Sequence, residues 1–235
     1  MSDRVASRPH PLDGCVLRIR RAGLYIEEAR ALIRQFESQC EDLVVANSAT
    51  KAGCGFPEVP ADLPLAVSDA AHNLRAALDY LVYELALRDS GSIQNGTQFP
   101  IESCKSGKAP GGSDVGFDAV VNRLLKGVSQ SNRDAIERLQ PYNGAHWARN
   151  LKEISNPDKH RHLIGIEKGK TIDLWIRGPG AGGKELPNGD KVSVDANHTI
   201  FIKLKSGEVS VTQTLYEIQA AAMDAVNGFR AAFNP

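Results

Sequence analysis

Residues 64–87, PLAVSDAAHNLRAALDYLVYELAL, predict one long helix, and we place this helix at the centre of the fold. If each residue is advanced by about 100° around the axis, the larger aliphatic side chains gather on one side. They are Leu74, Leu78, Leu81, Val82 and Leu85. The opposite side carries groups of fixed hydrogen-bonding geometry: Asp69, His72, Asn73, Arg75, Asp79, Tyr80 and Tyr83. Because buried charges are costly unless they are paired, we expect an internal polar network whose partners come from another segment.

The composition is that of a soluble globular protein, with 42% hydrophobic and 24% charged residues in a chain of 235. The formal net charge of zero argues against capture of nucleic acid or anionic membrane by bulk electrostatics. No apolar run approaches the ~18 residues that a membrane span needs. The N-terminal segment MSDRVASRPHPLDG has no apolar signal core, so we expect a cytoplasmic protein.

The sequence contains none of the common motifs of metal-binding or cofactor-binding sites. The four cysteines are scattered without a CxxC pair: Cys15, Cys40, Cys54 and Cys104. The chain also lacks HExxH, GxSxG and GxGxxG. We therefore expect no metal site and no cofactor.

The pattern along the chain predicts a single domain that is mainly α-helical, with a small antiparallel β-sheet inserted before the last helix. We expect a flexible arm at 1–12, a helical bundle at 13–166, the sheet at 171–212 and a C-terminal helix at 213–233 that returns to the bundle. Alternating apolar and polar residues at 171–176, 192–194 and 198–204 predict the strands.

Further helices are predicted from apolar spacing at 13–40, 117–125, 132–139, 146–154 and 215–233. The LVVA run within 41–47 predicts a short strand. Asp62 is the expected cap of the central helix, and Pro64 suits its first turn because the missing N–H is harmless there. The caps expected for the two helices at 132–139 and 215–233 are Ser131 or Asn132 and Thr212 or Thr214.

Two polar groups of residues could carry chemistry. On the central helix, His72, Arg75 and Asp79 follow each other at i, i+3 and i+7, so that Arg75 and Asp79 can pair. The second group is the run at 156–162, whose candidate residues are Asn156, Asp158, Lys159, His160 and Arg161. If the two groups meet, basic side chains from both could hold an anion, and the imidazole of His72 or His160 could transfer a proton. A buried network of the same residues could instead only set helix register.

Four segments resemble, in this order, a family of uncharacterised bacterial proteins. They are SDAAHNLRAALDYLVYEL at 68–85, FPI at 99–101, LQPY at 139–142 and NPDKHR at 156–161. Members of that family carry a helix like DALHNLRSALDHL and a later segment like NxDKHR, and the resemblance covers roughly residues 60–165. Their helix motif is in turn similar to the signature of HEPN domains, which are helical bundles that cleave RNA without a metal, usually across a dimer interface.

The HEPN resemblance implies roles for two residues. An arginine and a histidine just over one turn later carry the cleavage in that scheme, and here Arg75 matches the arginine while Tyr80 stands at the histidine position. A tyrosine with an ordinary pKa near ~10 is a poor general base at neutral pH. The residues that remain candidates for catalysis are Arg75, Asp79, His72 and His160, and those for binding are Asn73, Tyr80, Asn156, Asp158, Lys159 and Arg161.

Three functions from different classes follow from these residues. The first is a non-catalytic HEPN-like module for binding or self-association, which the tyrosine at position 80 and the zero net charge favour. The second is a HEPN-like metal-independent endoribonuclease or nucleotide-acting protein of a toxin or phage-defence system. The third is a binding protein for an anionic small molecule held by Arg75 and Lys159. The expected partners are RNA or an anionic ligand, and a second copy of the chain.

Overall fold

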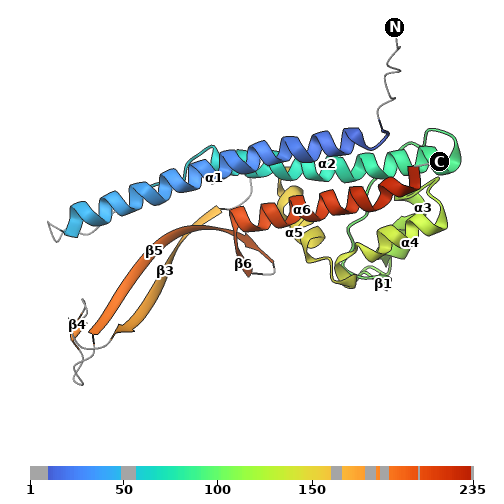
Figure 1. Cartoon of the computed structure of the whole chain (residues 1–235). Helices are drawn as coiled ribbons and strands as arrows, with labels where there is room; N and C mark the ends of the chain where they lie inside the picture. The colour runs from blue at the N-terminus through green and yellow to red at the C-terminus, as the bar shows by residue number, and fades with distance from the viewer. Residues whose placement is uncertain are drawn as a thin grey trace, which may run out of the picture.

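The computed structural model describes residues 10–48, 57–159, 166–177, 184–185, 191–205 and 207–233 (Figure 1). The helices are α1 (Asp13–Ser48), α2 (Leu63–Ser90), α3 (Phe117–Leu124), α4 (Gln130–Arg138), α5 (His146–Lys159) and α6 (Val211–Arg230). Two short 3-10 helices are η1 (Pro141–Asn143) and η2 (Ala231–Phe233). The strands are β1 (Gly107–Lys108), β2 (Asp114–Val115), β3 (Ile166–Arg177), β4 (Lys184–Glu185), β5 (Lys191–Leu204) and β6 (Gly207–Ser210). The prediction of a mainly helical chain with a small antiparallel sheet is confirmed.

The long helix predicted at 64–87 is α2, and it lies at the centre of the helical part as expected. It packs against α1, α5 and α6, while α3 and α4 lie at the end of the bundle where α2 ends (Figure 1). All five leucine and valine side chains of its predicted apolar side are fully buried: Leu74, Leu78, Leu81, Val82 and Leu85. The buried stripe of α2 is wide because helices cover it on more than one side.

Helix α1 runs antiparallel to α2, since Arg18 near its start contacts Tyr80 in the second half of α2. Its buried side chains, with Leu12 just before the helix, are spaced alternately by three and four residues: Leu12, Cys15, Ile19, Ala22, Ile26, Ala29, Ile33, Phe36 and Cys40. This is the heptad spacing of a coiled-coil seam, and it keeps one face of the helix in contact with its neighbours along its length. The opposite face of α1 remains exposed.

The sheet is built around the pairing of β3 with β5, in a register that runs from Ile166 opposite Ile202 to Arg177 opposite Lys191. Strands β4 and β6 also pair with β5, and all these pairings are antiparallel. Figure 1 shows the β3–β5 ribbon leaving the bundle, with β4 at its far end. Close to the bundle, β5 contributes three buried side chains to the common core: Ile200, Ile202 and Leu204.

Three predicted element boundaries are wrong. The LVVA run at 43–46 is not a strand, because α1 continues through it to Ser48. β-branched residues lower helix propensity only slightly, and extending an existing helix is much easier than nucleating one. Helix α5 likewise continues to Lys159 instead of ending at 154, and β3 begins at Ile166 instead of 171. The first error removes a predicted strand from the order of elements, and the other two place an end too early or too late.

Helix caps also differ from the prediction. Asp62 occupies the N-cap position of α2 as expected, but its side chain makes no capping hydrogen bond. Helix α4 is capped by Ser129, and α6 by Ser210, whose hydroxyl accepts a hydrogen bond from the N–H of Gln213. The predicted caps Ser131, Asn132, Thr212 and Thr214 all lie inside these helices. Adjacent hydroxyl residues are chemically equivalent candidates, so the backbone turn decides between them.

Candidate functional site

The predicted polar centre on α2 is occupied by the main chain of residues 99–102. The carboxylate of Asp79 accepts a hydrogen bond of 2.8 Å from the N–H of Phe99, and Arg75 donates to the carbonyl oxygen of the same residue. The Nε of Arg75 lies 3.5 Å from Oδ1 of Asp79. One residue pair on α2 therefore satisfies both polar groups of a single peptide residue whose side chain is fully buried.

Two further side chains, from outside α2, hold the same loop. Gln140 donates from Nε2 to the carbonyl oxygen of Pro100 at 2.9 Å and accepts at Oε1 from the N–H of Glu102 at 2.9 Å. Lys152 on α5 donates to the carbonyl oxygen of Ile101. We call Arg75, Asp79, Gln140 and Lys152 the loop clamp. A loop that inserts apolar side chains into a core needs such partners, because buried peptide groups without hydrogen bonds are costly.

The electrostatics of Arg75 follow from this position. Its side chain is 14% exposed. Burial lowers the pKa of Arg75, while the carboxylates of Asp79 and Glu102 act in the opposite direction and favour the charged form. Since a guanidinium starts from a pKa far above neutrality, Arg75 stays charged and is held between two carboxylates and a carbonyl oxygen. Its terminal nitrogen donates to the carbonyl oxygen of Phe99, while its Nε lies buried beside Asp79 without a hydrogen bond of its own.

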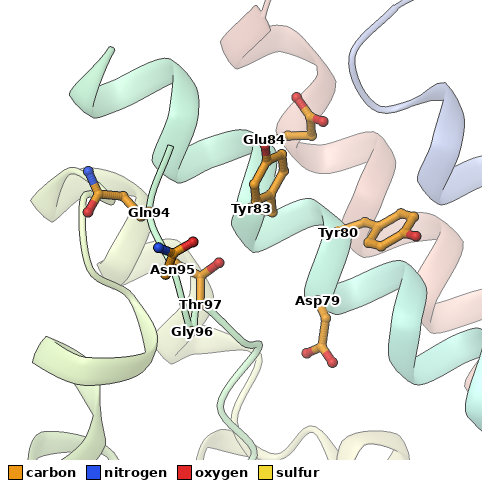
Figure 2. Close-up of a pocket in the computed structure, with 8 residues that line it drawn as sticks. All are labelled: Asp79, Tyr80, Tyr83, Glu84, Gln94, Asn95, Gly96 and Thr97. Atoms are coloured by element: carbon orange, nitrogen blue, oxygen red, sulfur yellow. The ribbon is translucent and has the colours of Figure 1, made fainter. Parts of the chain in front are cut away.

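The other predicted residues of α2 point elsewhere. Tyr80 is turned toward α1, where its hydroxyl accepts a hydrogen bond of 2.8 Å from Arg18 and the guanidinium lies 4.5 Å from the ring centroid. Figure 2 shows Tyr80 and Asp79 pointing in different directions. His72 is exposed, and the amide of Asn73 donates to the carbonyl oxygen of Asp69 at 2.9 Å.

The spacing of the predicted arginine and tyrosine explains their separation. Residues five apart on a helix differ by about 140° around the axis, so Arg75 and Tyr80 face different neighbours unless a groove spans both. In this fold the tyrosine contacts Arg18 of α1 while staying 44% exposed, and the arginine bonds to the 99–102 loop. The structure brings Arg75 and Asp79 into contact, whereas the side chain of Tyr80 points away from Asp79 and bonds to Arg18 of α1.

The second predicted group, at 156–162, lies at the end of α5. Asn156 is half-buried in that helix, and Asp158 and Lys159 belong to its last residues. His160 and Arg161 lie outside the described residues. Among the described residues, the partners of Arg75 and Asp79 come from residues 99–102, and Lys152 of α5 also bonds to this loop. Lys152 and Gln140 were not among the predicted site residues, although the LQPY and FPI segments of the resemblance contain Gln140 and its loop partner.

A cavity of about 550 Å³ opens beside the clamp, between α2 and the loop that precedes residue 99 (Figure 2). Its lining is Asp79, Tyr80, Tyr83, Glu84, Gln94, Asn95, Gly96 and Thr97. Two carboxylates contribute to it, and this lining contains no lysine, arginine or histidine. The cavity therefore offers hydrogen-bond acceptors and negative charge, which suits a cation or a hydrogen-bond donor better than an anion.

Among the residues that line this cavity, Glu84 is the one whose pKa is shifted. Burial raises the pKa of Glu84 above its ordinary value. The buried thiol of Cys15 on α1 lies nearby: burial, followed by the charge of Glu84, raises the pKa of Cys15 to about 12. Cys15 is thus a neutral thiol at physiological pH and a poor nucleophile. Neither Glu84 nor the loop residues 94–97 carried a motif, so only the structure identifies them.

Two searches of the described residues bear on the class of site. They contain no group of three or more His, Cys, Asp or Glu side chains placed to hold a metal ion. None of the helices among them combines the length and the apolar character needed to cross a bilayer. A scan against protein-family models and searches of curated proteins and of solved structures find no match to this chain. Its function is therefore argued from its own geometry.

Proposed function

We propose that this chain is a non-catalytic, HEPN-like helical module that associates with a second copy of itself. The observation that carries the non-catalytic assignment is the engagement of Arg75 and Asp79 by the main chain of Phe99. An arginine that stabilises phosphate charge during RNA cleavage must be free to approach the phosphate. Here the guanidinium is tied to a carbonyl oxygen and lies beside a carboxylate, and Tyr80 faces a different helix.

The surface that supports self-association is the exposed face of α1. Leu17 and Leu24 are 63% and 60% exposed, and with Arg21 and Glu28 they form one stripe at i, i+4, i+7 and i+11. We call these four residues the outer α1 stripe. Two such stripes that cross antiparallel next to Leu24 set Arg21 of each copy opposite Glu28 of the other and bury Leu24 of both copies at the crossing. The stripe is thus complementary to itself, as a two-fold interface requires.

The oligomeric state and a charge exchange test the association. We expect the wild-type protein to sediment as a dimer at tens of micromolar, and we expect Arg21→Glu and Glu28→Arg each to shift it to the monomer. The double variant should restore the dimer, because the two charges are opposite each other again. Ile93→Glu, which alters an exposed apolar residue in a loop away from α1, is the control and should stay dimeric. A monomeric wild type, or a double variant that stays monomeric, would refute the interface.

The non-catalytic assignment is tested with RNA and with His72→Ala. His72 is exposed, so its replacement should leave the melting temperature unchanged. We expect purified protein to leave single-stranded RNA intact at low salt, with and without this substitution. RNA cleavage by the wild type that is lost in His72→Ala, at equal folded fraction, would overturn the assignment in favour of a metal-independent ribonuclease.

A further inference from the structure

The cavity between α2 and residues 94–97 contains polar groups that the protein itself does not use. Among the described residues, no hydrogen bond or ion pair engages the carboxylate of Glu84, the hydroxyl of Tyr83 or the side chains of Asn95 and Thr97. Figure 2 shows that they come from both walls: Tyr83 and Glu84 from α2, and Asn95 and Thr97 from the loop. Buried or half-buried polar groups normally find partners within a protein. Asn95 is exposed to solvent, but Tyr83, Glu84 and Thr97 are half-buried, and their unused groups around one volume point to a partner from outside the chain.

The charges around the cavity decide what kind of partner fits. Asp79 contributes one negative charge, which Arg75 at 3.5 Å largely balances. Glu84 contributes a second negative charge, and no cationic side chain lies near enough to pair with it. Within the described part of the chain, the one cation stacked on a lining residue is Arg18, and it lies over Tyr80. The uncompensated charge of the cavity is therefore negative and is located at Glu84.

We propose that this cavity binds a small organic ammonium ion, with the ammonium group hydrogen-bonded to Glu84 and its carbon chain against the ring of Tyr83. An ammonium group supplies only hydrogen-bond donors, and the carboxylate, the phenol oxygen and the amide and hydroxyl oxygens of the loop supply acceptors. The aromatic ring adds a favourable face for a cation. The volume of about 550 Å³ lies within the range of small-molecule sites.

Other ligand classes fit this lining less well. An anion would meet the carboxylate of Glu84 without a lysine, arginine or histidine to balance it. A divalent metal ion would need several carboxylate or imidazole ligands, and the described residues offer no such group. A purely apolar ligand would leave the polar groups of both walls without partners. A neutral polyol could use the same hydrogen bonds, so it is the alternative that the experiment must separate.

Two probes of equal length and different charge distinguish an ammonium site from a polyol site. We choose 1,4-diaminobutane and 1,4-butanediol, titrated into the full chain by calorimetry at an ionic strength of about 0.15 M, where the Debye length is about 8 Å. We expect the diamine to bind at least about tenfold more tightly than the diol. Amide chemical shifts of Asn95, Gly96 and Thr97 should move with the diamine. Equal affinity for the two probes would overturn the ammonium assignment in favour of a polyol site.

Variants locate the bound probe. Glu84→Gln should weaken the diamine at least about tenfold, because a charged hydrogen bond is replaced by a neutral one. Glu208→Gln removes the same charge from an exposed position on β6 and should bind like the wild type. Tyr83→Phe retains the ring and should weaken binding only a few-fold. Absence of binding at tens of millimolar diamine, or unchanged affinity in Glu84→Gln, would refute the site. The dimer tests on α1 are independent of all these outcomes.

Discussion

Replacing Gln140 by leucine is the sharpest test of the loop clamp. The side chain is fully buried, and leucine has a similar volume without polar atoms. The substitution leaves the carbonyl oxygen of Pro100 and the N–H of Glu102 without their partners. Each unsatisfied buried group costs about 1–3 kcal/mol, so we expect a loss of about 2–6 kcal/mol in the free energy of unfolding.

Urea unfolding followed by circular dichroism measures this loss directly. Thermal unfolding gives a second measure. For a protein of this size a loss of about 1 kcal/mol lowers the melting temperature by about 2–4 °C, so the melting temperature of the variant should fall by at least about 4 °C. Gln98→Leu is the matched control, because Gln98 is exposed just before the clamped loop and only its main chain is bonded, to the carbonyl oxygen of Leu124. We expect the control to change stability by less than about 0.5 kcal/mol. If the two variants lose the same amount, the clamp does not stabilise the fold as described.

Three further predictions concern other positions. Gly116→Ala should lower the free energy of unfolding by about 2–4 kcal/mol, because φ is +94° and an added Cβ would lie 2.8 Å from two backbone oxygens. The control is Gly112→Ala, where φ is +82° and the surrounding space is open, and it should lower the free energy of unfolding by about 1 kcal/mol. Burial alone would raise the pKa of Asp89, but hydrogen bonds, the first from the N–H of Ser129, outweigh it and lower the pKa. The charged form of Asp89 therefore stabilises the fold at pH values above the unfolded pKa of ~3.9. Wild type should melt at a higher temperature than Asp89→Asn there, and this difference should shrink as the pH falls below that value. The pKa of Glu84 is shifted in the opposite direction, upward, so ionisation of Glu84 destabilises the fold. Glu84→Gln should therefore melt at a higher temperature than wild type at neutral pH, and at the same temperature below the unfolded pKa of ~4.3.

The candidate site was only partly predictable from the sequence. The pairing of Arg75 with Asp79 follows from their i, i+4 spacing, and both side chains are in contact as expected. A partner was expected from the run at 156–162, part of which lies outside the described residues, and the partner that the structure shows is the main chain of Phe99. Peptide groups are the same in every residue, so a backbone partner leaves no side-chain pattern to read. Gln140 was missed for the same reason, because its bonds also go to main-chain atoms.

The sequence by itself determined the central helix and its buried side, because the period of a helix places apolar residues on one face whatever lies opposite. It also determined that alternating segments would form a small sheet before the last helix. Only the tertiary structure decided that Tyr80 would face α1 and that a cavity would form at Glu84. These outcomes depend on which distant segments pack against a face, and packing is settled by the whole chain at once.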